Sequence, residues 1–204
     1  MIFRLPLFLV LIAATTVMAT ADDLASQVLE EINLARTQPQ QYAQIVAGRG
    51  EGAREAVEFL QRVRPLPPLA WSAGISQAAR AHAVDVGSRG GRGHNGANGD
   101  TPWKRMSRFG KWNGFVGENI DYGHADARSI VISLIIDNGV PGRGHRVNLF
   151  KRDFKVTGIA VGPHASAGSI CVMDFATGFT EAGEQRVAER ATVSRSAYSG
   201  MSFF

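Results

Sequence analysis

Three short motifs set a proton- or metal-competent side chain among glycines. They are Gly93-His94-Asn95-Gly96, Gly117-Glu118-Asn119-Ile120 and Gly144-His145-Arg146-Val147-Asn148. Two neutral imidazoles with one or two carboxylates suit a borderline divalent ion such as Zn²⁺ and leave a coordination position open for water or a ligand. Without a metal, the same groups can form His–carboxylate pairs in which the carboxylate orients the imidazole and raises its pKa. These residue types therefore predict a polar cleft.

The signatures of several common enzyme classes are missing from the sequence. It has no H-E-x-x-H helix, no G-x-S-x-G motif and no P-loop, which would indicate a zinc protease, a serine hydrolase or a nucleotide-binding protein. Several serines are available for pairing with a histidine, but none has the sequence context of a nucleophile: Ser72, Ser88, Ser107 and Ser133.

The other histidines have less specific surroundings. His82 lies on an apolar helical face, which favours a hydrogen-bonded core histidine over a ligand. His124 follows Asp121-Tyr122-Gly123 and either lines the cleft or, as we favour, lies exposed in a turn. His164 falls in a predicted hairpin turn, and we expect it to face solvent.

Length and composition indicate one globular domain with a substantial core, since 45% of the 204 residues are hydrophobic and 20% are charged. The net charge is +4, and no block of Lys and Arg is interleaved with aromatic residues, which argues against nucleic-acid binding. Cys171 is the only cysteine, so no intramolecular disulfide can form, and its apolar surroundings predict a buried thiol.

Residues 1–21 have the pattern of a signal peptide. Arg4 precedes an apolar run over residues 5–17, and Ala19-Thr20-Ala21 suits cleavage. The run is shorter than the ~20 residues that a membrane-spanning helix needs. We therefore predict a secreted or periplasmic protein with no transmembrane segment after cleavage.

Hydrophobic periodicity predicts helices followed by a strand, a helix and a β-hairpin, which is an α+β fold with a largely antiparallel sheet. Ser72, Thr101 and Asp126 are the predicted N-caps. Pro39 marks a break in the first helix or its end, and residues 180–204 are predicted to be a poorly ordered tail. The predicted helices are 24–35, 56–63, 72–86, 101–106 and 127–136; the strands are 115–120, 154–161 and 169–175, with a turn at 162–168.

The order of these motifs resembles the CAP superfamily of cysteine-rich secretory proteins, antigen 5 and pathogenesis-related 1 proteins, whose domain is also called SCP. Residues 71–82 look like its early helix, and residues 94–106 are similar to the histidine and short-helix segment of bacterial members without disulfides. The motifs at 117–120 and 144–148 match its two most recognisable signatures, and Met173-Asp174-Phe175 resembles its last strand. The resemblance covers residues 24–179, and we take residues 22–179 as the domain.

The resemblance implies an α-β-α sandwich with a mainly antiparallel central sheet and a cleft holding two histidines and two acids. His94 and His145 take the histidine positions, where they would bind a metal, and Glu118 takes the first acidic position. The second acid is usually a Glu, whereas this chain has Asp137 in that neighbourhood. Asp137 either completes the tetrad or satisfies the turn that follows its helix.

Two functions are compatible with this cleft. The first is an extracellular binding module that can hold Zn²⁺ or another divalent cation and that captures a lipid, a glycan or a peptide. The alternative is a hydrolase in which Glu118 or a histidine acts as the general base on a metal-bound or free water. A purely structural envelope protein is a third, weaker hypothesis.

Overall fold

The computed structural model describes residues 7–184, and for residues 7–20 it describes the backbone alone. Its helices are α1 (Leu7–Thr37), α2 (Pro39–Val46), α3 (Ala53–Arg62), α4 (Ala73–Arg89), α5 (Pro102–Ser107), α6 (Ala127–Ile136), the 3₁₀ turn η1 (Pro141–Arg143) and α7 (Gly144–Leu149). Its strands are β1 (Ala70–Trp71), β2 (Gly110–Tyr122), β3 (Val156–His164) and β4 (Gly168–Glu181).

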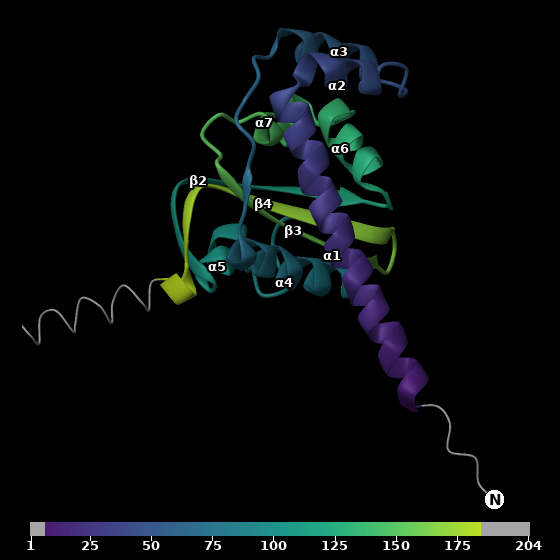
Figure 1. The fold of residues 1–204 in the computed structure, drawn as a ribbon, viewed down its shortest axis with the longest axis vertical. Coiled ribbons are helices and arrows are strands. Elements are labelled where there is room, and N and C mark those ends of the chain that lie inside the picture. Colours follow the sequence, from purple (N-terminus) through teal and green to yellow (C-terminus); the bar gives the residue numbers. More distant parts are fainter. Residues whose placement is uncertain (1–6, 185–204) are drawn as a thin grey trace, which may run out of the picture.

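The four strands form one sheet in the order β1-β3-β4-β2. β4 pairs antiparallel with β2 and β3, whereas the two-residue β1 pairs parallel with β3. Helices α4 and α5 cover one face of this sheet, and α1, α6 and α7 lie on the other (Figure 1). The predicted α+β class is confirmed, and the sheet is mixed because of the short parallel strand β1.

β4 is buried on both faces, and its alternate side chains enter different parts of the core. Ile170 and Val172 pack with apolar residues of α4, whereas Cys171, Met173 and Phe175 pack with the larger cluster around α1 and α6. The predicted burial of the thiol is confirmed, because Cys171 is 1% exposed and burial raises the pKa of its thiol.

Helix α4 lies directly on the backbone of β3. A Cβ atom at Gly158 would lie 2.1 Å from the backbone nitrogen of Ser76, a separation that real Cβ atoms do not reach. Position 158 therefore admits glycine alone while α4 keeps its place. The close contact brings the first turns of α4 against the middle of the sheet.

Two of the three predicted helix caps form as expected. The Ser72 side chain accepts a hydrogen bond from the Ile75 amide at 3.1 Å, and Asp126 accepts one from the Ser129 amide at 2.9 Å. Thr101 precedes Pro102 at the start of α5, but its side chain makes no capping hydrogen bond. The predicted break at Pro39 is confirmed, since α1 ends at Thr37 and α2 begins at the proline.

Several element limits differ from the sequence-based prediction. β2 starts five residues before the predicted strand, and β3 and β4 extend into the predicted turn, so that the hairpin connection is short. Residues 180–184, which we predicted to begin the tail, form the end of β4 and a helical turn, while residues 185–204 lie outside the described residues. Cross-strand pairing with Gly110 and Lys111 on β2 holds the end of β4 in place.

The predicted signal peptide falls partly outside the described residues. Residues 7–20 are helical and continue without a break into the rest of α1. No helix in the described part of the chain is both long and apolar enough to cross a membrane.

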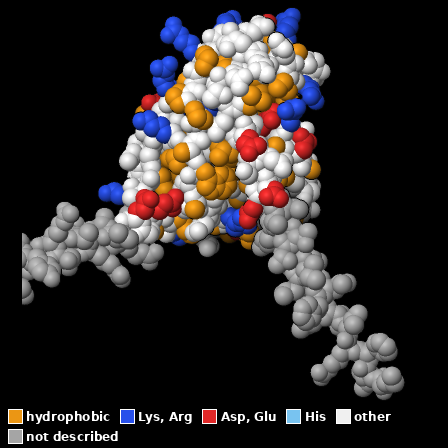
Figure 2. All heavy atoms as spheres, viewed as in Figure 1, with side chains coloured by type: hydrophobic (Ala, Val, Ile, Leu, Met, Phe, Trp, Pro, Cys, Tyr) orange, Lys and Arg blue, Asp and Glu red, His pale blue; other side chains and the backbone are white. Residues whose placement is uncertain are grey.

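Charged side chains are unevenly spread on the face drawn in Figure 2. Lys and Arg gather around the end that carries α2 and α3, whereas Asp and Glu lie nearer the middle and the opposite end (Figure 2). The face is therefore electrostatically polar.

Candidate functional site

The first His–carboxylate pair joins the loop after α4 to strand β2. His94 Nδ1 lies 2.8 Å from Glu118 Oε1, and the other carboxylate oxygen contacts the Arg105 guanidinium from α5. The Glu118 side chain is 2% exposed and that of Arg105 is 1% exposed, whereas that of His94 is 52% exposed. A buried, charge-paired carboxylate therefore holds an imidazole at the surface.

Arg105 also fixes the loop that carries His94. Its Nη1 atom donates hydrogen bonds to the carbonyl oxygens of His94, at 3.0 Å, and Asp100, at 2.6 Å. The Arg105 guanidinium thus positions both the Glu118 carboxylate and the backbone of His94, whose ring Glu118 orients. The hydrogen bond to Glu118 raises the pKa of His94, and partial burial opposes this rise.

The second pair lies at the junction between α6 and α7. Asp137 follows α6 in the left-handed conformation, with φ at 53°, and its Oδ1 atom lies 2.6 Å from His145 Nδ1. Its Oδ2 atom accepts a hydrogen bond from the His145 amide at 2.9 Å. The side chain of Asp137 is 2% exposed and that of His145 is 26% exposed. Asp137 therefore contacts His145 and also satisfies the turn that follows its helix.

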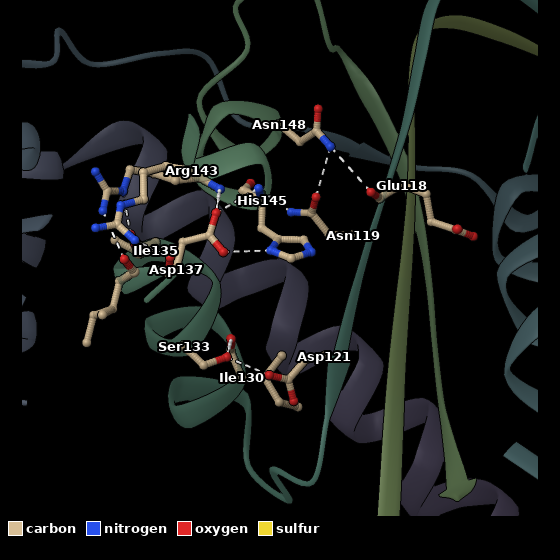
Figure 3. Close-up of polar contacts among 12 residues, drawn as sticks. Glu118, Asn119, Asp121, Ile130, Ser133, Ile135, Asp137, Arg143, His145 and Asn148 are labelled. Atoms are coloured by element: carbon tan, nitrogen blue, oxygen red, sulfur yellow. Dashed lines mark hydrogen bonds and ion pairs between the residues drawn. The ribbon is translucent and has the colours of Figure 1, made fainter. Parts of the chain in front are cut away.

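The two pairs lie on different sides of the backbone of β2, which is an edge strand. Glu118 points away from His145, whereas the His145 ring points toward the strand (Figure 3). Asn119, the next residue along β2, donates a hydrogen bond to the His145 carbonyl at 2.9 Å. Asn148 in turn donates to Asn119 Oδ1 at 2.9 Å. The four predicted residues thus form two pairs joined through asparagines.

Both imidazoles keep one nitrogen free of the protein. Nδ1 of His94 and Nδ1 of His145 contact carboxylates, and neither Nε2 atom has a hydrogen bond to another described residue. Within residues 7–184, no group of three or more His, Cys, Asp or Glu side chains is placed to hold a metal ion. The arrangement offers two separate imidazole nitrogens, each with a carboxylate behind it.

The remaining histidines test the other predictions. His82 is fully buried and its Nε2 lies 2.9 Å from the Gly93 carbonyl oxygen, which confirms a hydrogen-bonded core histidine. The expectation that His164 faces solvent is wrong, because it is 3% exposed with Nε2 2.7 Å from the Gly91 carbonyl oxygen. The hairpin turn folds back onto the end of α4, so this ring is covered. His124 is half-exposed in its turn, as favoured, with Nδ1 2.9 Å from Asp121 Oδ1.

Sequence reasoning missed two charged residues that surround Glu118. Arg105 lies in the segment that resembles the family's short helix, but its position alone did not mark it as the partner of Glu118. Asp174 faces Glu118 from β4 and is fully buried. Its signal was an acid inside the apolar run Ile170–Phe175, where an unpaired carboxylate is costly.

The sequence profile of the Cysteine-rich secretory protein family, CAP, matches residues 29–175. The chain belongs to this family. The match spans all of the site residues, from the loop that carries His94 to Asp174 on β4. A search of curated proteins finds no sequence match.

Two solved structures resemble parts of this CAP chain. One is an extracellular protein containing an SCP domain from Bacillus anthracis str. Ames, with 24% identity and a TM-score of 0.45 over 54% of this chain and 34% of that chain. The CAP chain thus spans about a third of that protein's length. The other is an outer surface protein from Borrelia burgdorferi, with 15% identity and a TM-score of 0.48 over 72% of this chain and 92% of that chain.

Proposed function

We propose that this CAP protein is an exported binding module that uses two solvent-facing imidazoles to engage its ligand. The observation that carries the proposal is the shared design of the two pairs. In each, a carboxylate with a side chain only 2% exposed engages Nδ1, while the other ring nitrogen has no hydrogen bond to a described residue. Because a carboxylate partner fixes the tautomer of an imidazole, Nε2 is the nitrogen available as an acceptor.

A divalent cation such as Zn²⁺ is the proposed cofactor; His94 and His145, which lie on different sides of β2, would each offer Nε2 as a ligand at a separate position. Glu118 would stand behind its histidine and would not be a ligand, because His94 and Arg105 already engage its two oxygens. Asp137 is similarly engaged by the ring and amide of His145. This donor set suits the carboxylate–histidine–metal arrangement, in which the carboxylate raises the basicity of the ligand. One nitrogen ligand at each position would leave the other coordination positions to water or to ligand groups, and the ion would polarise whatever binds there.

A separate groove supports a ligand with an apolar part. A groove of about 570 Å³ lies between the proline-rich connector and the start of β3, lined by Pro65–Pro68, Arg152, Phe154 and Lys155. None of the four site residues lines it. An apolar floor with two cations at its rim favours, among the lipid, glycan and peptide ligands considered, an anionic lipid.

Metal analysis of the purified mature protein tests the metal proposal. We expect Zn²⁺ binding by calorimetry in the wild type and its loss in the His94→Ala/His145→Ala variant. His124→Ala is the matched control, because His124 is also half-exposed and paired with a buried carboxylate. Binding that survives the double substitution, or that disappears equally in the control, would contradict the assignment.

A hydrolase is the second candidate, and the His94–Glu118 pair is what favours it. An exposed imidazole with Nδ1 held by a buried carboxylate can take a proton from water through Nε2. A broad screen of peptide and ester substrates tests this function. Turnover that His94→Ala abolishes without unfolding the protein would support it, and no turnover with or without added metal would argue for binding alone.

Export is the remaining part of the proposal. The segment over residues 1–21 predicts removal of the N-terminal part of α1. N-terminal sequencing of the protein recovered outside the cytoplasm should give Thr20 or Asp22 as the first residue. Recovery of the intact chain from the cytoplasm alone would contradict this part.

A further inference from the structure

Asp174 is a buried acid that neither His–carboxylate pair uses directly. It lies on β4 opposite Glu118 of β2 and Gly158 of β3, and it is fully buried. Directly opposite residues on neighbouring strands project to the same face of a sheet. The carboxyl groups of Asp174 and Glu118 therefore lie side by side beneath α4 and α5.

The charged groups that face this carboxyl pair come from three elements. Two charged side chains face Asp174: Glu118 from β2 and Arg105 from α5. Helix α4 contributes the fully buried His82, which interacts electrostatically with Glu118 and Arg105. β3 contributes Gly158, which carries no side chain. Asp174 thus lies beside one carboxylate and in the field of one guanidinium.

Within the residues that the structure describes, Asp174 has no hydrogen-bond partner as an ionised carboxylate. Neither of its carboxylate oxygens has a hydrogen-bond donor among the described residues. The Glu118 carboxyl group projects beside it from the neighbouring strand, and two ionised carboxylates cannot donate to one another. The contact is a hydrogen bond only if one carboxyl group holds a proton. Two adjacent buried carboxylates sharing one proton is the arrangement that like-charge repulsion favours.

The proton belongs to Asp174 because the donors are distributed unequally. Glu118 contacts the Arg105 guanidinium and the His94 ring, both of which favour its ionised form. Asp174 has neither contact. Burial, followed by the charge of Glu118, raises the pKa of Asp174 well above its ordinary value, and Arg105 opposes this rise.

We propose that Asp174 is a positioning residue: a neutral carboxylic acid that donates a hydrogen bond to Glu118 and so fixes the carboxylate that orients His94. The inference rests on the His94–Glu118 pair of the proposed function and extends the pair into a chain from β4 to the surface. Glu118 then has three donors, from Asp174, Arg105 and His94. Its carboxylate is held from both strands and from α5, although β2 is an edge strand.

Infrared spectroscopy of the metal-free full-length protein tests the protonation state directly. We expect the carbonyl band of a protonated carboxylic acid at neutral pH in the wild type, and its loss in Asp174→Asn. Asn is nearly isosteric and keeps a donor toward Glu118, so this variant should fold. A wild type without the band at neutral pH, or a band that Asp174→Asn leaves in place, would overturn the proposal.

Nuclear magnetic resonance of His94 tests the positioning role. Asp174→Asn should leave the titration midpoint of His94 within about 0.3 pH unit, because it removes no charge. The Nδ1 proton of His94 should stay protected from exchange in this variant and lose that protection in Asp174→Leu, which has no donor. A lowered midpoint in Asp174→Asn would mean that Asp174 is ionised, and full protection in Asp174→Leu would exclude the positioning role. If Asp174→Leu does not fold, the infrared band and Asp174→Asn still decide. Since no metal is present, these results do not depend on whether His94 binds one.

Discussion

The two His–carboxylate pairs reach similar geometry by different means. Glu118 is held by side chains from α5 and from the glycine-rich loop after α4, and its histidine on that loop has 52% of its side chain exposed. Asp137 is held mainly by the backbone, through the amide of His145 and its own left-handed conformation, and its histidine is on a helix. Removing one side chain should therefore disturb the first pair far more widely than the second.

The largest expected effect is that of Arg105→Ala. This change leaves the buried Glu118 without its guanidinium partner and releases the carbonyl oxygens of His94 and Asp100. Removing one partner of a buried ion pair costs about 3 to 5 kcal/mol, so the free energy of unfolding should fall by that amount. Denaturant unfolding measures it. Arg108→Ala, which breaks a half-exposed contact with Asp100, is the control and should cost less than about 1 kcal/mol. Equal losses in the two variants would show that the buried Arg105–Glu118 ion pair stabilises the fold no more than the half-exposed Arg108–Asp100 ion pair does.

Asp137→Ala should have an intermediate effect. It removes the acceptor for the His145 amide and ring and places alanine in a left-handed conformation, which we expect to cost about 2 kcal/mol of unfolding free energy. Asp137→Asn keeps an oxygen acceptor and tolerates this conformation, so its loss should be less than half as large. Thermal or denaturant unfolding of both variants checks the order. An Asn variant as unstable as the Ala variant would show that charge, and not the backbone, dominates at this position.

The pH dependence of His94 should separate the pairs without a large change in stability. Glu118 raises the pKa of His94, so the folded state binds this proton more tightly than the unfolded state does. The resulting stabilisation is complete below the unfolded pKa near 6.5 and is lost as pH rises through the higher folded value. Glu118→Gln should lower the pKa of His94, as measured by NMR. An unchanged or raised pKa of His94 in this variant would contradict the role given to Glu118.

The smallest expected effect is that of His124→Gln. Its contact with Asp121 is 43% exposed on the histidine side, and Asp121 keeps a hydrogen bond from Ser133 at 2.5 Å. The free energy of unfolding should change by less than about 1 kcal/mol. A larger loss would show that a His–carboxylate pair is stabilising in this fold without a guanidinium or a backbone cap.

The sequence predicted the elements well where one local signal dominated. The caps at Ser72 and Asp126, the break at Pro39 and the buried Cys171 each follow from a residue's own chemistry and its nearest neighbours. The limits of β2 were harder, because its first residues, Gly110 to Asn113, have no apolar alternation and are fixed by pairing with the end of β4.

The partners of the site residues depend on contacts that are distant in the sequence. Motifs and the family resemblance gave His94, Glu118, Asp137 and His145 and the possibility of His–carboxylate pairs, but not that the two pairs lie on different sides of β2. Arg105 and Asp174 reach Glu118 from α5 and β4, and only the strand register brings Asp174 opposite it. The error at His164 has the same origin, because a turn that looked exposed folds back onto Gly91.

The bare backbone of Gly158 has a consequence for the acid beside it. Asp174 lies opposite Gly158 on the neighbouring strand, and the backbone of α4 packs directly against that glycine. A methyl group at position 158 would wedge the helix away from the sheet, and solvent could then reach the interior carboxyl groups. Because Gly158 has no side chain, α4 can pack closely enough on β3 to exclude solvent from the carboxyl groups of Asp174 and Glu118.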